Sequence, residues 1–264
     1  MTLTLNSAKT LPRTLRSAAT LADEFVVVDG YSTDDTVTIA RNFGAKVVQR
    51  KPDGFGPARN EALKIVEGDW VFNLDSDETI TSDLEEELER YMDGGSCNAI
   101  KVPRVNVKAG RVSQWLSKDY ELRLYKKGLL RYTKLIHETD SPDFLEAPVY
   151  VYAQHPLTNY NSMNFREQYW KNVRDFRWSI LSSKMSSASR LFRLPYFMVK
   201  WPLYLLVRQH YLRDGLHGIA LALVEVVAYV NALEIVIRDG AYRSKAKAPW
   251  GRKGPRRRRR ESTD

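Results

Sequence analysis

The stretch Asp69-Trp-Val-Phe-Asn-Leu-Asp-Ser-Asp-Glu78 gives the first indication of how this 264-residue chain is built. Its apolar run, Trp70 to Leu74, ends directly at an acidic cluster. The pattern predicts a buried strand that leads into a loop carrying two carboxylates, Asp75 and Asp77. Because ligands bind at the carboxyl ends of the strands in an open α/β sheet, we expect this loop to border a ligand site.

Two carboxylates one residue apart repel each other unless a cation lies between them. Oxygen ligands of this kind suit Mg²⁺ or Mn²⁺, and a metal ion held in this way usually binds a substrate diphosphate. The alternative is structural. The acidic residues would then cap the N-terminus of a helix that begins near Ser82.

Strand and helix patterns alternate up to about residue 105, which favours an α/β fold of βαβ units with a mostly parallel sheet. Ser32 and Thr33 are candidate N-caps of a helix, and Ser82-x-x-Glu85 has the spacing of a capping box. The first strand begins at Met1 and is short, so we expect the true start to lie a few residues upstream. The expected strands are 1–6, 25–28, 45–49, 70–74 and 98–105, and the expected helices are 9–21, 34–43, 57–66 and 82–92.

Charge is distributed unevenly along the chain. Residues 1–150 carry a net charge of −4 and residues 151–264 a net charge of +13. A basic C-terminal part predicts an anionic partner surface, either a membrane or a nucleic acid. The single cysteine, Cys97, excludes an intramolecular disulfide and fits a reducing compartment. Residues 1–20 lack the apolar segment of a signal peptide.

The most apolar part of the chain, residues 194–237, is interrupted by charges and contains no uninterrupted run long enough for a spanning helix. We expect interfacial helices in the headgroup layer of a membrane, or alternatively two core helices of a soluble subdomain. Residues 243–260 contain ten Lys or Arg and no acidic residue, which predicts a disordered tail attracted to anionic lipid. The expected interfacial anchors are Trp201, Tyr204, Tyr211 and Tyr229.

Three segments then carry a resemblance to a known family: Asp29-Gly-Tyr-Ser-Thr-Asp-Asp-Thr36, Gly54-Phe-Gly-Pro-Ala-Arg-Asn-Glu-Ala62 and Asn73-Leu-Asp-Ser-Asp77. In this order they resemble the family 2 glycosyltransferases of GT-A fold. Leu122-Arg-Leu-Tyr125 and Ile136-His-Glu138 resemble the subgroup of WaaE/KdtX-type lipopolysaccharide core glucosyltransferases. The resemblance implies an inverting, metal-dependent sugar transfer from a nucleoside diphosphate sugar, with UDP favoured, to a lipid-linked or lipopolysaccharide-core saccharide.

Within this framework, Asp29 can accept hydrogen bonds from the base or ribose of the nucleotide. Arg59 can neutralise phosphate oxygens, although it could also be a surface helix residue. Asp77 is the expected direct ligand of the metal ion, with Asp75 toward the ribose or a metal-bound water. His155 could complete the metal shell or be a structural histidine. Further residues expected at the nucleotide sugar are Asn6, Ser7, Ser32 and Asp34.

The acceptor hydroxyl requires a general base. Glu138 is the favoured candidate, Asp119 the second and His137 the third. The catalytic GT-A domain is expected over residues 1–155, a helical acceptor- and membrane-associating region over 156–240, and a disordered polybasic tail over 241–264. The predicted location is the cytoplasm, peripheral on the inner face of the cytoplasmic membrane, with residues 195–260 on the anionic surface.

Other functions are compatible with parts of the pattern. A polyprenyl-phosphate glycosyltransferase and an inactive sugar-nucleotide-binding protein share the same motifs. A nucleotidyltransferase usually has a Gly-rich loop after its first strand, which residues 6–12 lack. Specific nucleic-acid binding is not expected, because the acidic N-terminal part offers no matching groove and no base-stacking motif.

Overall fold

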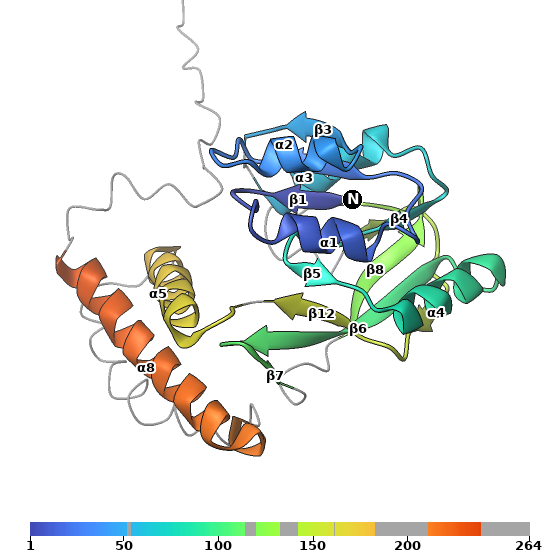
Figure 1. Ribbon diagram of the computed structural model, residues 1–264. Coiled ribbons are helices and arrows are strands. Elements are labelled where there is room, and N and C mark those ends of the chain that lie inside the picture. Colours follow the sequence, from blue (N-terminus) through green and yellow to red (C-terminus); the bar gives the residue numbers. More distant parts are fainter. Residues whose placement is uncertain (52–53, 114–119, 133–141, 161, 183–210, 239–264) are drawn as a thin grey trace, which may run out of the picture.

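The computed structural model describes residues 1–51, 54–113, 120–132, 142–160, 162–182 and 211–238. The described part contains a three-stranded sheet, a seven-stranded sheet, a separate two-stranded pair and two packed C-terminal helices (Figure 1). The predicted anchors Trp201 and Tyr204 and the predicted tail, 241–264, lie outside the described residues.

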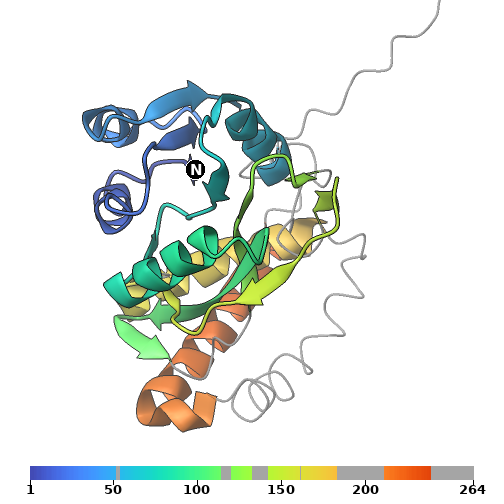
Figure 2. The ribbon, with the colours of Figure 1, turned by 90° about the vertical axis from the view of Figure 1, so that its right-hand side faces the viewer.

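The first sheet is parallel, with the strand order β1 (Thr2–Thr4), β2 (Val26–Asp29) and β3 (Lys46–Gln49). Helices α1 (Leu11–Ser17) and α2 (Thr36–Asn42) cover one face, and α3 (Phe55–Ile65) covers the other (Figure 2). All four residues of β2 are buried, as its apolar sequence predicts for a strand covered on both faces. The βαβ alternation expected from the sequence is confirmed here.

The second sheet is mixed, which corrects the expectation of a mostly parallel arrangement. Its main path is β4-β8-β6-β12-β5, and β11 and β7 also pair with β6. The central strand β6 is antiparallel to β8 and β7 but parallel to β12 and β11. A short Ala109-Gly110 turn connects β6 to β7, so this pair forms a hairpin instead of a crossover. The bounds are β4 Trp70–Phe72, β5 Glu78–Thr79, β6 Ala99–Lys108, β7 Arg111–Ser113, β8 Tyr120–Lys126, β11 Tyr150–Tyr152 and β12 Leu157–Tyr160, with β9 (Leu130–Arg131) and β10 (Asp143–Phe144) as a separate pair.

Backbone hydrogen bonds at Met1 join the two sheets. The Met1 amino group donates to Phe72 O at 2.6 Å, and Leu74 N donates to Met1 O at 3.2 Å. Because Met1 precedes β1, these bonds join the amino end of β1 to the carboxyl end of β4, and the loop after β4 then reaches Ser7, which follows β1. Burial of the amino group lowers its pKa to about 5, an effect that Glu24 partly opposes.

Helix α4 (Ser82–Asp93) covers one face of the second sheet and packs Leu84 and Leu88 against Ile100 and Leu124. Its N-cap is Thr81, whose hydroxyl accepts from Leu84 N at 3.3 Å, so the predicted cap at Ser82 is one residue too late. Cys97 is buried in the same apolar cluster, with 4% of its surface exposed. Because Thr81 caps α4, Asp75 and Asp77 do not act as its N-cap, which was the structural alternative for the acidic loop.

The C-terminal part contains α5 (Phe165–Ser182), a 3₁₀ turn (Tyr211–Asp214) and α8 (Gly215–Arg238), and α5 packs against α8. Although charged residues interrupt the apolar sequence of this part, α8 is continuous from Gly215 to Arg238 and includes Glu225. By length and composition, Leu212–Val236 could cross a membrane, and one third of its most apolar window is buried. Strand β12 belongs to the second sheet although it follows the expected domain boundary at residue 155, so the sheet extends to Tyr160.

Candidate active site

Asp29 lies at the carboxyl end of β2 and is completely buried. Its carboxylate accepts from Thr4 Oγ1 at 3.0 Å, from Ser32 N at 2.8 Å and from Gln49 Nε2 at 3.2 Å. These donors come from β1, from the turn after β2 and from β3. Asp29 is therefore fixed at the edge of the sheet where a nucleotide is expected.

The turns after β1 and β2 are connected by hydrogen bonds. Asn6 N donates to Ser32 Oγ at 2.8 Å, and Thr33 N donates to Asn6 Oδ1 at 2.8 Å. Asp34 accepts from Ala8 N at 3.1 Å and from the hydroxyl of Thr36. Burial alone would raise the pKa of Asp34, but these hydrogen bonds outweigh burial and lower it. The structure thus brings the predicted nucleotide residues together around the two turns.

Ser7 connects these turns to the acidic loop. Its N–H donates to Thr36 Oγ1 at 2.7 Å, and its hydroxyl lies 3.0 Å from Ser76 Oγ. Ser76 is the residue between the two loop carboxylates. Ser7 therefore lies between the expected nucleotide site and the expected metal site.

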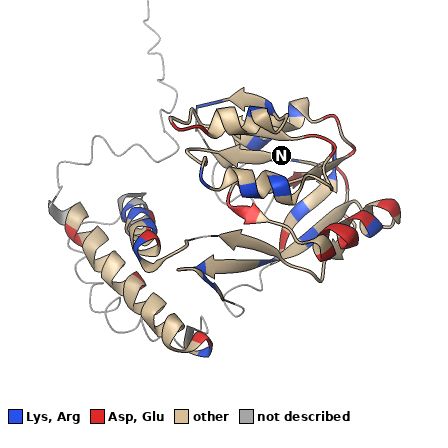
Figure 3. Cartoon of the chain, viewed as in Figure 1, with Lys and Arg blue, Asp and Glu red and all other residues tan. Residues whose placement is uncertain are grey.

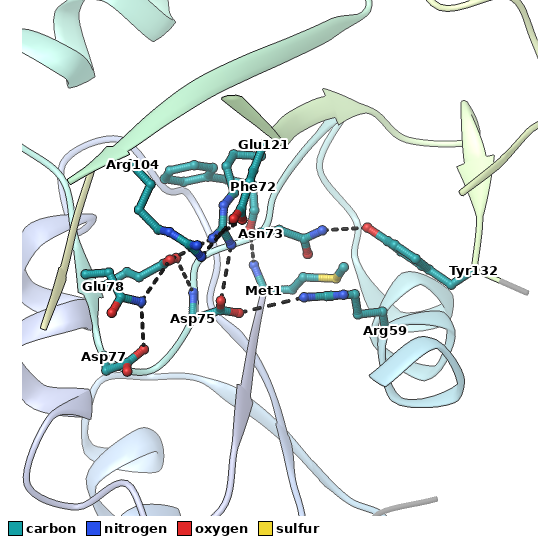
Figure 4. A network of polar contacts seen from close by, with 12 residues as sticks. Met1, Arg59, Phe72, Asn73, Asp75, Asp77, Glu78, Arg104, Glu121 and Tyr132 are labelled. Atoms are coloured by element: carbon teal, nitrogen blue, oxygen red, sulfur yellow. Dashed lines mark hydrogen bonds and ion pairs between the residues drawn. The ribbon is translucent and has the colours of Figure 1, made fainter. Parts of the chain in front are cut away.

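Asp75 is held between two guanidinium groups. Its carboxylate lies 3.7 Å from Arg59 Nη2 and 3.4 Å from Arg123 Nη1 (Figure 4). Burial opposes ionisation, but Arg123 and Arg59 outweigh it and hold the pKa of Asp75 below its usual value. Arg59 has only 6% of its surface exposed, which excludes the alternative of a surface helix arginine. It projects from α3 toward the loop, as a phosphate-binding residue requires.

Arg123 in β8 is a central residue of the site that sequence reasoning missed. Its side chain is 1% exposed and lies 2.6 Å from both Glu78 and Glu121, and Arg104 lies 2.8 Å from Glu121. The available signal was a charged residue between two leucines, Leu122 and Leu124. Burial, followed by the negative charge of Asp75, raises the pKa of Glu78.

Asp77 lies at the other end of the loop, beside Asn159 of β12. Asn159 Nδ2 donates to Asp77 Oδ1 at 3.4 Å and to Glu78 Oε1 at 3.3 Å. Burial and the neighbouring Asp75 raise the pKa of Asp77. Sequence reasoning also missed Asn159, because nothing in its local sequence distinguishes it from other strand residues.

The acidic loop is surrounded by side chains of both charges. The carboxylates of Asp75, Glu78 and Glu121 lie among the guanidinium groups of Arg59, Arg104 and Arg123, and the positive charge of Lys171 acts on Asp77. Within the described residues, no group of three His, Cys, Asp or Glu side chains is placed to hold a metal ion. Two carboxylates and the buried, unpartnered Oδ1 of Asn159 nevertheless fit a hard cation that takes its other ligands from phosphate oxygens and water.

The structure pairs His155 with Glu87 of α4. His155 Nδ1 lies 2.9 Å from Glu87 Oε2 of α4, and His155 N donates to the same carboxylate. Asp77 O accepts from Tyr160 N, five residues further along the chain. His155 is therefore a structural partner of Glu87, which was the alternative reading.

The three candidate bases, Asp119, His137 and Glu138, lie outside the described residues. The residue before the second segment, Tyr132, is described. Asn60 Nδ2 donates to Tyr132 O at 2.7 Å, and Tyr132 N donates to Asn60 Oδ1 at 2.9 Å. The ring of Tyr132 lies 5.3 Å from the guanidinium carbon of Arg59. The segment that contains His137 and Glu138 therefore follows, in sequence, a residue that lies beside Arg59, the predicted phosphate-binding residue.

Comparisons with known proteins give the family. A sequence profile described as Glycosyl transferase family 2 matches residues 1–173. An uncharacterized glycosyltransferase of Rickettsia bellii is 40% identical over 87 residues, which are 33% of this chain and 30% of that protein. The poly(ribitol-phosphate) beta-N-acetylglucosaminyltransferase TarS of Staphylococcus aureus strain Mu50 is 31% identical over 127 residues, which are 44% of this chain and 22% of TarS. The matched regions thus span less than a third of these relatives.

Among solved structures, residues 1–349 of S. aureus TarS in complex with UDP-GlcNAc align with a TM-score of 0.44 and 19% identity, covering 90% of both chains. Glucosyl-3-phosphoglycerate synthase from Mycobacterium tuberculosis, in complex with Mn²⁺ and UDP-glucose, aligns with a TM-score of 0.33 and 27% identity over 40% of this chain and 42% of that one. The family assignment rests on the profile, which covers well over half of the sequence and all strands of both sheets. The chain belongs to glycosyl transferase family 2 and has the GT-A-like α/β fold predicted from its motifs.

Proposed function

We propose that this protein is an inverting glycosyltransferase that transfers a sugar from a nucleoside diphosphate sugar, with UDP-hexose favoured, to a saccharide hydroxyl. The observation that carries the proposal is the placement of three features around one region: Asp29 at the carboxyl end of β2, the Asp75–Asp77 loop after β4, and Arg59 of α3, which contacts Asp75. Met1 and Ser7 connect this loop to the first sheet. The sequence likeness to TarS, whose name is that of a beta-N-acetylglucosaminyltransferase, supports a sugar-transferring activity.

In this proposal each described side chain has a role that its geometry supports. Asp29 accepts hydrogen bonds from the nucleoside, and Arg59 binds the diphosphate. Asp77, helped by Asp75, holds Mg²⁺ or Mn²⁺, which stabilises the negative charge that develops on the departing diphosphate. A general base then takes the proton of the acceptor hydroxyl, with Glu138 proposed first, Asp119 second and His137 third.

The acceptor is proposed to be a lipid-linked or lipopolysaccharide-core saccharide, in line with the resemblance of Leu122–Tyr125 and 136–138 to the WaaE/KdtX-type subgroup. Its support is an exposed apolar surface on α8. Figure 3 shows that α8 carries few charged residues and α5 many. One face of α8 packs on α5. The opposite face exposes an apolar stripe at helical spacing, which we call the α8 stripe: Leu216, Ile219, Leu223, Val227 and Val230.

We propose that the α8 stripe docks on the anionic inner leaflet of the cytoplasmic membrane. Leu216 is 85% exposed and Leu223 60% exposed, so a large apolar area faces outward. The polybasic residues 243–260 follow α8 directly in sequence and would add electrostatic attraction to acidic lipid. The catalytic unit expected over residues 1–155 would then extend to Tyr160, because β12 belongs to its sheet. The acceptor- and membrane-associating region would follow it to residue 240, and 241–264 would be the basic tail.

Calorimetric titration of UDP, GDP and ADP, each with and without Mn²⁺, tests the proposed function on the wild type and on Asp77→Ala. We expect metal-dependent binding of UDP to the wild type and loss of that metal dependence in the variant. Thermal unfolding of the variant should remain near that of the wild type, because Asp77 lies on a loop. Failure of the wild type to bind any of the three nucleotides would overturn the proposal.

A further inference from the structure

The amide of Asn159 lies between two carboxylates of the candidate site. The antiparallel pairing of β12 with β5 places Asn159 opposite Glu78, and only 7% of the residue is exposed. Its Nδ2 is 3.4 Å from Asp77 Oδ1 and 3.3 Å from Glu78 Oε1. Both distances are long for hydrogen bonds between an amide and a carboxylate, whose usual range ends near 3.2 Å. The amide is therefore close to both acids but tightly bound to neither.

The other end of the same amide is unsatisfied. Asn159 Oδ1 is buried and has no hydrogen-bond partner. Leaving a buried acceptor unpaired costs about 1–3 kcal/mol, so such atoms are rare and usually have a role. Rotation of an asparagine amide by half a turn exchanges its nitrogen and oxygen in nearly the same volume. Asn159 can thus offer a donor to the bare carboxylates or an oxygen to a cation beside them.

We propose that Asn159 is a metal-binding residue of this site, whose Oδ1 coordinates the divalent cation alongside Asp77. The inference rests on the proposed function. Amide oxygens are hard ligands of the type that Mg²⁺ and Mn²⁺ accept. A neutral ligand also suits this position, because Asp77 and Asp75 already supply carboxylate oxygens to the cation. With the cation bound, the carboxylates no longer need the Nδ2 donor, and the unpaired oxygen gains a partner.

Two substitutions separate oxygen coordination from hydrogen bonding. Asn159→Asp keeps an oxygen in place and removes the Nδ2 donor, whereas Asn159→Leu removes both in a similar volume. Mn²⁺ binding in the presence of saturating UDP is measured by calorimetry and by the loss of the free Mn²⁺ electron paramagnetic resonance signal. We expect Mn²⁺ affinity to fall about ten- to a hundredfold in Asn159→Leu and to be retained or increased in Asn159→Asp.

Metal-free UDP binding and thermal unfolding serve as checks of the fold. Asn98→Leu is the matched control, because the amide of Asn98 bonds the backbone of Val149 and Ala147, away from the acidic loop. If Asn159→Asp loses Mn²⁺ as Asn159→Leu does, the donor is what matters and the inference is overturned. Retention of Mn²⁺ affinity by Asn159→Leu would overturn it as well. After either outcome, Mn²⁺-dependent UDP binding by the wild type would leave the proposed function standing. Absence of that binding would overturn the proposed function and the inference on Asn159 together.

Discussion

Arg123 neutralises the acidic side chains behind the candidate site. It contacts Glu78 and Glu121 at 2.6 Å and Asp75 at 3.4 Å, with almost no exposure to solvent. Burial disfavours its charge, but the surrounding carboxylates outweigh that effect and raise its pKa. A buried ion pair of this kind contributes little net stability, yet removing one partner is costly because the other charge remains buried.

Arg123→Met should therefore lower the free energy of unfolding by about 3–5 kcal/mol, as measured by urea denaturation at pH 7. Without the arginine, burial would hold the pKa of Glu78 above its value in the unfolded chain. The folded variant would then bind more protons than the unfolded one, and its stability would fall further as pH rises from 5 to 8. Arg123→Lys, which keeps the charge, should lose less. Equal stability of Arg123→Met and the wild type would contradict this role.

The sequence located the side chains at strand ends but not those that act across strands. Asp29, Arg59 and Asp77 follow local patterns of apolar strand, turn and helix start, and the structure places them around one region. Arg123 and Asn159 reach this region because β8 and β12 pair with distant segments in a particular register. Short motifs contain no information on such a register. The predicted bases Asp119, His137 and Glu138 stay predictions.

Individual helices and strands were predictable where the local signal was strong. The apolar runs of β2 and β4 and the helical spacing of α2 and α3 gave their positions to within a few residues. The mixed order of the second sheet was not predictable in this way, because β6 pairs with strands that precede and follow it by many residues. The α4 cap was misplaced by one residue, since both Thr81 and Ser82 have suitable hydroxyl groups.

Thr81→Ala tests this correction at the start of α4. The variant loses the side-chain acceptor for Leu84 N and should be destabilised by about 1 kcal/mol in urea unfolding. Ser82→Ala, one residue later, should change stability by no more than about 0.5 kcal/mol. The reverse order of the two effects would restore Ser82 as the cap.

Glu24 precedes β2 and bonds both the start of β3 and the loop after α3, and its ionisation makes stability depend on pH. It accepts from Lys46 Nζ at 2.8 Å and from the N–H groups of Glu67 and Gly68. Burial opposes ionisation, but Lys46 and the backbone donors outweigh it and lower the pKa of Glu24 from 4.5 to about 2. The stabilisation is therefore complete above the unfolded pKa and is lost as pH falls through the folded one.

Glu24→Gln should lower the free energy of unfolding at pH 7 by about 1–3 kcal/mol. The difference from the wild type should shrink as pH falls from about 4.5 to 2, where the wild-type carboxylate also becomes neutral. Urea unfolding at a series of pH values measures this difference directly. A constant difference between pH 2 and pH 7 would show that the charge of Glu24 is not responsible.

At the scale of the whole molecule, the acidic N-terminal part contains the candidate site, and the basic C-terminal part carries the α8 stripe. Replacing Leu223 and Val227 by Ser should weaken binding to phosphatidylglycerol vesicles by about tenfold or more, because each side chain contributes about 1.5–3 kcal/mol when buried in lipid. Deletion of residues 243–264 should also weaken it, more strongly at low salt. Vesicle sedimentation measures both effects.

The matched control replaces two exposed apolar residues outside α8, Leu145 and Val149, by Ser. This variant should bind vesicles as the wild type does, and all variants should keep UDP binding. Unchanged sedimentation of both the α8 variant and the tail deletion would remove the membrane from the proposed function without affecting the nucleotide site.

The burial of Cys97 beneath α4 makes site-specific labelling of this protein simple. It is the single cysteine of the chain, with 4% of its surface exposed, and burial raises the pKa of its thiol. A thiol of this kind reacts slowly with maleimides, since the thiolate is the reactive form. A cysteine introduced at Leu216 would therefore be the preferred site for a fluorophore in the otherwise native protein, and its emission would report directly whether α8 enters lipid.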